Sequence, residues 1–271
     1  MPIRREDNPL LYFLNVERHR FVRSFSERFS GKKFAGHRSD VTTSARVAVH
    51  KSLLLRTLAG TDMRLQVNKV TNLRLGAATV DGLVIMPGET FSLWRAIGRA
   101  SAGRGYLSGM LLADGKVKEG VGGGLCQLAN LLYWLALHSP LTVAERHHHS
   151  LDFFPDSGRV LPFGSGASIF FNYIDLQLRN DTPYTFKLRT WVDEKFLRGE
   201  IFSDALPPFA YHIEERGHHF YRNNTGDWRR ENWLYQISRA RSSGAVIEEK
   251  LIAHNDAKVL YPMPGNIVAS T

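Results

Sequence analysis

Hydrophobic and polar positions repeat with helical spacing in the first part of the chain. Apolar side chains recur every three or four residues through Leu10–Phe29, with arginines between them. Shorter stretches predict helices over Val47–Leu58 and over Asp62–Val80, which ends at an Asp81-Gly82 turn. The pattern therefore predicts a helical segment ahead of the rest of the fold.

The Leu10–Phe29 helix has two interpretations. The first is a helix packed on the body of the protein. The alternative is a helix that lies on an anionic membrane surface, where its arginines would meet the headgroups. These arginines are Arg18, Arg20, Arg23 and Arg28. The sequence leaves both interpretations open, so a peripheral membrane contact through Leu10–Phe29 is kept as a hypothesis.

The pattern changes to strands later in the chain. Leu83–Met86 and Thr90–Leu93 flank a Pro87-Gly88 turn, and the stretch from Leu161 to Asp204 is rich in aromatic and β-branched residues. The strands predicted in that stretch are Ile169–Tyr173, Asp175–Leu178 and Phe186–Val192. Beyond Pro207-Pro208, a small antiparallel extension is predicted from Tyr211–Tyr221, Trp233–Arg241 and Ala245–Ile252.

Together these elements predict an α+β fold in which a cysteine-bearing helix packs on an antiparallel sheet. We divide the chain into a helical N-terminal segment of residues 1–60, a core domain of residues 61–205 and a C-terminal β extension of residues 206–271.

The segment Val121–Ser150 carries the most informative chemistry. The run Gly122-Gly123-Gly124 leads into an apolar helix over Leu125–His138, so Cys126 lies in the first turn of that helix. The free N–H groups and the dipole of a helix start favour negative charge, and we therefore expect a lowered thiol pKa. Amides of the glycine turn, together with Gln127, are candidates to hold a substrate oxyanion.

Lengths along the chain suggest a partner for this cysteine. From Cys126 to His138 a helix rises about 18 Å, at about 1.5 Å per residue. An extended Thr142–His149 covers about 23 Å, at about 3.3 Å per residue, so an antiparallel return brings His149 back to the level of Cys126. Cysteine and histidine would then act as nucleophile and base.

Other roles for Cys126 stay open. A single cysteine is often a small buried apolar residue. Cys126, His147 and His149 would also form a possible zinc-ligand set.

Acidic and amide side chains after the histidines are candidates to orient the imidazole. Asp152, Asp156, Asn172 and Asp175 all follow within reach. Asn172 and Asp175 lie on predicted strands but three residues apart, so they point to opposite faces and at most one can serve. Glu89, in the Pro-Gly-Glu turn, either pairs with a base such as Arg95 or lies in the same cleft as Cys126.

Composition narrows the setting. One cysteine excludes an internal disulfide and suits a reducing compartment. No apolar run approaches the roughly 18 residues of a membrane span, and the start lacks a secretory core, so we expect a cytoplasmic protein. The net charge of +9 suits nucleic acid, anionic lipid or an acidic substrate. No nucleic-acid-binding motif is present, so we expect no nucleic-acid partner, and no cofactor is expected.

Five short motifs in a fixed order resemble the VanW-like domain of glycopeptide-resistance clusters. They are Asn72 to Ala78, Pro87–Ser92, Gly105-Tyr106, Gly122–Gln127 and Glu145–Ser150. The wider family often has Gly-x-Asp-Ala in the strand region, whereas this chain has Gly164-Ser165-Gly166-Ala167. The missing acid at position 166 removes one candidate third member of a catalytic triad.

The resemblance implies an accessory role in vancomycin-type resistance, in clusters that rebuild peptidoglycan precursors to end in D-lactate. It specifies no reaction, so two hypotheses follow. The first is a cysteine hydrolase or acyl-transferase acting near the cell-wall precursor. The second is a non-catalytic module that binds an anionic peptidoglycan precursor at the glycine turn. The candidate binding residues besides the turn are Arg104, Tyr106, Arg146 and Ser150.

Overall fold

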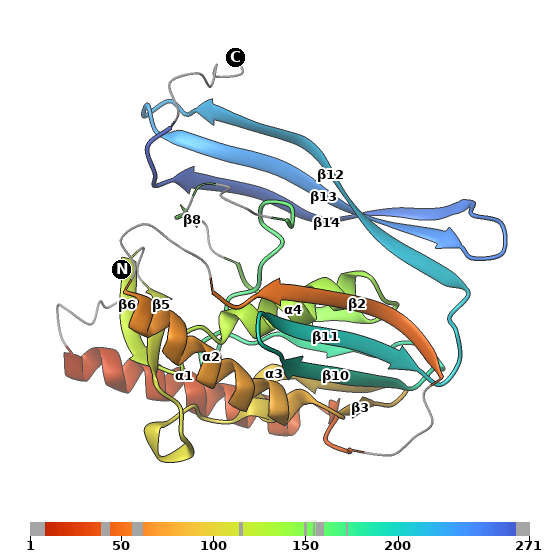
Figure 1. Cartoon of the computed structure of the whole chain (residues 1–271), viewed down its shortest axis with the longest axis horizontal. Helices are drawn as coiled ribbons and strands as arrows, with labels where there is room; N and C mark the ends of the chain where they lie inside the picture. Colours follow the sequence, from red (N-terminus) through yellow and green to blue (C-terminus); the bar gives the residue numbers. More distant parts are fainter. Residues whose placement is uncertain are drawn as a thin grey trace.

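A buried helix, α4 (Cys126–Leu137), lies at the centre of the fold (Figure 1). Most of its residues are buried, and the half-buried ones, Cys126, Gln127, Asn130 and Trp134, lie on one face. The computed structural model describes residues 9–38, 44–55, 62–113, 116–148, 151–153, 155, 160–171 and 173–263.

The sheet beside α4 is antiparallel throughout. Its strand order is β2 (Ala45–Leu53), β11 (Phe196–Ser203), β10 (Phe186–Val192) and β3 (Val84–Ile85). Helix α4 packs on β2 and β11. The predicted α+β class, with the cysteine-bearing helix on an antiparallel sheet, is confirmed.

The predicted helix over Val47–Leu58 is wrong, because most of this stretch belongs to strand β2. Exposure alternates along β2, and the strand pairs with β11 from Leu53 opposite Phe196 to Ala45 opposite Ser203. The apolar run is short enough to fit the period of a helix or that of a strand. It forms a strand because it pairs with a strand that is distant in the sequence. Residues 56–58 lie outside the described residues.

Helix α2 (Met63–Val80) confirms the prediction over Asp62–Val80. Asp62 caps its start by accepting the Arg64 N–H at 2.7 Å. The helix packs against β10 and against the short helix α3 (Leu93–Ile97). Gly76 brings it close to α4, since a Cβ there would lie 2.8 Å from the Leu125 side chain.

Two smaller sheets complete this part of the fold. One has the order β1 (Lys33–Phe34), β4 (Glu89–Ser92), β9 (Gln177–Arg179) and β7 (Thr142–Glu145). The other is the hairpin of β5 (Ser108–Ala113) and β6 (Lys116–Val121), preceded by the 3-10 turn η1 (Ala102–Arg104). The hairpin leads the chain directly into the glycine turn before α4.

The C-terminal strands are longer than predicted. Strands β12 (Phe209–Arg222), β13 (Trp228–Ala240) and β14 (Val246–Val259) form an antiparallel ribbon that crosses above the rest of the fold (Figure 1). Strand β8 (Leu151–Asp152) joins β14 in parallel, so the ribbon is tied back to the segment after β7. The predicted strand Ile169–Tyr173 shows only the bridge between Phe170 and Ile174, and Asn172 lies outside the described residues.

Helix α1 (Pro9–Phe29) confirms the first predicted helix, but its apolar side chains do not pack on the protein. Phe21 is 72% exposed and Phe29 is 69% exposed. The helix does pack on the body of the protein, but through its polar residues Arg20, Arg23 and Glu27. No helix among the described residues is long and apolar enough to cross a membrane.

The contact between α4 and β11 gives a test of the packing. A Cβ at Gly199 would lie 2.7 Å from Leu135 and 2.9 Å from Leu131 on α4. We expect Gly199→Val to lower the free energy of unfolding by about 1–3 kcal/mol, measured by urea unfolding, because the added side chain overpacks the core. Strand propensity alone would predict the opposite sign, since valine favours strands. Gly36→Ala is the control, because a Cβ there meets nothing within 4 Å; equal effects of the two substitutions would contradict the packing argument.

Candidate functional site

The glycine turn between β6 and α4 is shaped by close backbone contacts. Gly122 and Gly124 have positive φ angles of 80° and 94°, which glycine adopts without strain. A Cβ on Gly123 would lie 2.1 Å from the carbonyl carbon of Gly109, and one on Gly124 would lie 2.1 Å from the Lys69 side chain. The turn therefore requires glycine at all of these positions for reasons of fold alone.

A buried asparagine holds this turn in place. The side-chain amide of Asn72 donates to the carbonyls of Leu107 and Gly123, both at 2.9 Å, and accepts the Leu107 N–H at 2.8 Å. Asn72 is fully buried, so these three bonds satisfy groups that water cannot reach. The sequence showed Asn72 only as a motif position; the signal for its role is a polar amide on the apolar side of a helix.

The thiol of Cys126 lies against the backbone of Ile169. The residue is half-buried, and burial raises the pKa of the thiol despite hydrogen bonds from the backbone of Ile169 and of Cys126 itself. The predicted lowering of the thiol pKa is wrong. Packing of α4 removes water from the sulfur, and this desolvation outweighs the favourable field of the helix start.

Several predicted oxyanion donors are already used within the protein. The Gly122 N–H donates to the Leu107 carbonyl and the Gly123 N–H to the Gly120 carbonyl, both at 3.0 Å. The Gln127 side chain donates to Ser52 Oγ at 2.9 Å and to the Leu53 carbonyl at 2.8 Å. Gln127 therefore ties α4 to the end of β2.

The chain does return toward Cys126 after α4, although β7 is shorter than predicted. Ser168 donates its N–H to the His147 carbonyl at 2.8 Å, and Ala167 donates to Asn130 Oδ1 at 2.7 Å. The short segment that contacts α4 thus also pairs with the chain at His147. His149 and Ser150 lie outside the described residues, so the Cys126–His149 pair stays a prediction.

The possible zinc set is not tested for the same reason. Among the residues that the structure describes, no group of three histidine, cysteine or acidic side chains is arranged to hold a metal ion. His149, which completes the proposed set, is not one of those residues.

The buried Asp175 and the partly buried Glu145 form a polar cluster with Arg23 of α1. Arg23 donates to both Glu145 oxygens, at 2.8 and 2.6 Å, and lies 3.8 Å from Asp175. Burial opposes ionisation of Glu145, yet the Arg23 hydrogen bonds bring the pKa of Glu145 below its ordinary value. Asp175 accepts from Ser92 Oγ at 2.5 Å and from the Trp94 N–H at 3.0 Å, and burial raises its pKa. These bonds place Asp175 at the start of α3.

Glu89 and its expected partner lie in different surroundings. The Glu89 carboxylate accepts the Met86 N–H of its own turn at 2.9 Å. The guanidinium of Arg95 lies 4.2 Å from the Phe34 ring and 3.5 Å from Glu27. Glu89 therefore stabilises its own turn, and the Arg95 side chain contacts both β1 and α1.

The two predicted binding residues of the Gly105-Tyr106 loop are also held within the fold. Arg104 donates to the carbonyls of Ile97 at 2.7 Å and Arg99 at 2.9 Å. Tyr106 is buried, its burial raises the pKa of the phenol, and its hydroxyl finds no hydrogen-bond partner in the described part of the chain.

Arg146 differs from these residues because it faces a cavity. Its Nε donates to the Gly166 carbonyl at 2.9 Å, a second nitrogen donates to the Gly164 carbonyl, and the guanidinium lies 4.7 Å from the Tyr133 ring. Burial lowers the pKa of Arg146, opposed only by the nearby Tyr133. No carboxylate among the described residues pairs with it. Its charge is therefore held in position without a compensating negative charge from the residues that the structure describes.

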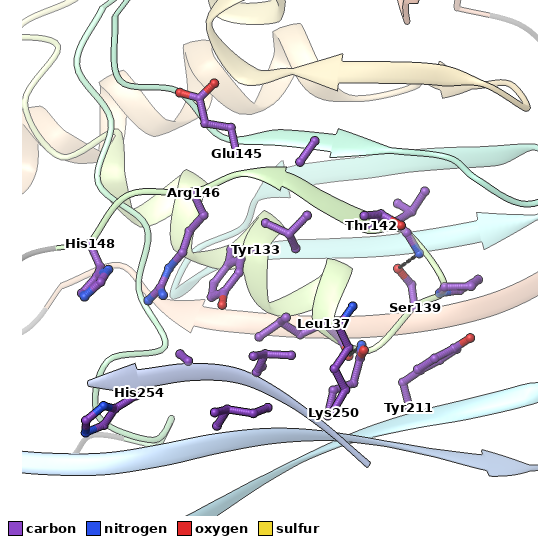
Figure 2. A pocket seen from close by; sticks show the side chains of 18 residues that line it. Tyr133, Leu137, Ser139, Thr142, Glu145, Arg146, His148, Tyr211, Lys250 and His254 are labelled. Carbon is purple, nitrogen blue, oxygen red and sulfur yellow. Dashed lines mark hydrogen bonds between the residues drawn. The ribbon is translucent and has the colours of Figure 1, made fainter. Parts of the chain in front are cut away.

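The cavity lies between α4 and β7 on one side and the ribbon β12–β14 on the other, and has a volume of about 510 Å³ (Figure 2). Arg146 and His148 point toward the ribbon, whereas Glu145 points away (Figure 2). Lys250 and His254 line the far wall, and His254 is paired with Glu231 at 2.6 Å. Sequence patterns missed this wall because its residues come from the C-terminal extension.

Comparisons with known proteins identify the family. A family model described as VanW like protein matches residues 68–202. The vancomycin B-type resistance protein VanW of Enterococcus faecalis (strain ATCC 700802 / V583) is 37% identical over 208 residues, which cover 77% of this chain and 75% of that protein. The chain belongs to the VanW family. The VanW-like match ends before β12, so the cavity lies between the family domain and the strands that follow it.

A second relative of this VanW-family chain is the uncharacterized protein YoaR of Bacillus subtilis (strain 168). It is 30% identical over 109 residues, which cover 40% of this chain and 34% of that protein. No solved structure matches the chain.

The Asn72 contacts give a stability prediction. We expect Asn72→Ala to lower the free energy of unfolding by about 2–3 kcal/mol, because it leaves buried groups of Leu107 and Gly123 unpaired. Asn68→Ala is the matched control: Asn68 lies one turn earlier, is half-buried and makes one bond, to the Ser108 carbonyl at 2.8 Å. Urea unfolding of both variants measures the difference, and equal losses would refute the special role of Asn72.

The raised thiol pKa gives a second prediction. We expect alkylation of Cys126 by iodoacetamide to reach half its maximal rate above about pH 8.5, the ordinary thiol value. The thiol ionises at a lower pH in the unfolded chain than in the folded protein. The contribution of the buried thiol to stability is therefore complete below about pH 8.5 and is lost as the pH rises through the folded pKa. Cys126→Ala should flatten that loss, and the chain unfolded in urea is the labelling control. A midpoint below the unfolded one would instead support an activated nucleophile.

Proposed function

We propose that this VanW-family chain is an accessory protein of vancomycin resistance that binds an anionic cell-wall precursor without turning it over. The uncompensated charge of Arg146 in the cavity wall is the observation that carries the proposal. The resistance setting comes from the printed name of the Enterococcus faecalis relative. The precursor is identified by class, as a peptidoglycan building block with carboxylate or phosphate groups.

A partly buried positive charge without a counter-charge carries an electrostatic cost that a bound anion removes. Arg146 is suited to such binding because its guanidinium is already oriented by the carbonyls of Gly164 and Gly166 and by the Tyr133 ring. A planar guanidinium also matches the two oxygens of a carboxylate or phosphate. Lys250 adds positive charge on the opposite wall of the cavity.

The hydrolase hypothesis has less support. A thiol whose pKa is raised by burial is mostly protonated at neutral pH and is a poor nucleophile without a base. The amides of Gly122 and Gly123 and the side chain of Gln127 donate to other groups of the protein. The same bonds weigh against precursor binding at the glycine turn. Binding at Arg146 needs none of these groups, and we favour it for that reason.

The decisive variant is Arg146→Gln. Calorimetric titration with a uridine-diphosphate-linked muramyl depsipeptide should show a dissociation constant at least about tenfold higher than that of the unmodified protein, since a buried charged contact is lost. Arg146→Lys should recover part of the affinity, because it restores charge without the two-pronged geometry.

The controls separate binding from chemistry. Arg222→Gln removes another arginine stacked on an aromatic ring, 4.9 Å from Trp228, and should leave the affinity unchanged. Cys126→Ser should also bind normally. Unchanged binding by Arg146→Gln would refute the proposal. Release of a cleaved product that stops with Cys126→Ser would establish the hydrolase instead.

A further inference from the structure

Helix α1 presents a continuous apolar surface to solvent. The surface, which we call the α1 outer face, is formed by Leu10, Leu14, Phe21, Val22, Phe25 and Phe29, each more than half exposed. The rings of Phe25 and Phe29 lie 4.6 Å apart, and those of Phe21 and Phe25 lie 6.4 Å apart. A contiguous apolar face of this kind on a soluble surface indicates an interaction site.

The polar face of the same helix is the one that packs on the protein. Arg23 binds Glu145, and Arg20 donates to the Phe171 carbonyl at 3.1 Å. Glu27 accepts from Gln177 at 3.0 Å and from Arg23 at 2.8 Å. This arrangement is the reverse of an ordinary surface helix, whose apolar face packs inward. Rolling the outer face inward would break the partly buried Arg23–Glu145 pair, so these contacts keep the apolar residues outside.

Charge on and near the outer face is positive. Arg18 and Arg28 are exposed on the same side of the helix, and Lys32 and Lys33 follow directly after it and are exposed. The acidic residues of α1, Glu17 and Glu27, are both ion-paired with arginines of the same helix. Basic side chains bordering exposed phenylalanines and leucines match a surface that is apolar within and anionic at its boundary.

We propose that α1 docks this protein on an anionic lipid bilayer. The helix lies in the plane of the interface, with the phenylalanines among the upper acyl chains and Arg18 and Arg28 beside the lipid phosphates. Figure 1 shows α1 and the ribbon β12–β14 on opposite sides of the molecule, so docking leaves the ribbon turned away from the bilayer. The inference is independent of the proposed ligand at Arg146.

Co-sedimentation of the full chain with vesicles tests the proposal. Vesicles of phosphatidylcholine with about one-third phosphatidylglycerol should bind the protein, and vesicles of pure phosphatidylcholine should bind it several-fold less, because basic residues contribute only at an anionic surface. High salt should weaken the binding to the anionic vesicles through screening. The double variant Phe21→Ser with Phe25→Ser should reduce the partition coefficient by about tenfold or more.

Two further variants make the test specific. Val246→Ser with Ile247→Ser removes two other exposed apolar side chains, on β14, and should leave vesicle binding unchanged. Arg18→Gln with Arg28→Gln should reduce binding to anionic vesicles and leave the weak binding to neutral ones. All four substituted α1 positions are exposed, and circular dichroism checks that each variant is folded.

Two results would overturn the proposal. One is failure of the unmodified protein to bind the anionic vesicles. The other is self-association, seen by analytical ultracentrifugation, that the phenylalanine variant abolishes while vesicle binding persists; the outer face would then contact a second copy of the chain.

Discussion

The helix that carries Cys126 depends on the close approach of the glycine turn to β5. Gly123 lies so close to Gly109 that neither residue has room for a side chain, and Asn72 locks the two segments together from α2. This contact fixes where α4 begins. Residues 126, 130 and 133 are separated by four and three positions, so they lie on one face of α4. Along this face Cys126 meets Ile169, Asn130 holds Ala167 and Tyr133 supports Arg146. One packing constraint thus positions both the thiol and the cavity arginine.

Burial acts on the charged groups in opposite ways. Arg23 and Glu145 are both partly buried and form an ion pair, so the pKa of Glu145 lies below its ordinary value despite its burial. Arg146 follows Glu145 directly but points to the other side of the chain, as successive residues of an extended segment do. It meets carbonyls and a ring there, which orient a cation without neutralising it. Desolvation also raises the pKa of the Cys126 thiol, which has no charged partner among the described residues, and this contrast is why binding is a better-supported role than nucleophilic attack.

Features set by local periodicity were accessible from the sequence. The long helices α1, α2 and α4 and the strand β10 follow from spacing, caps and turn residues, and these signals act within a few turns of the chain. The strand at Ala45–Leu53 was missed because β11, which completes its hydrogen bonds, lies far along the chain. The thiol pKa and the isolation of Arg146 were also out of reach, because both depend on which distant segments exclude water. The far wall of the cavity comes from β14, which no motif marked.

The two surfaces of interest are connected through one short stretch of chain. Glu145 ends β7 and binds Arg23 of α1, and Arg146 enters the cavity one residue later. Glu145 also accepts the Asp175 N–H at 3.0 Å, so the cluster joins α1, β7 and the segment before β9. The placement of α1 on the molecule and the entry of Arg146 into the cavity therefore both depend on the path of the chain at the end of β7.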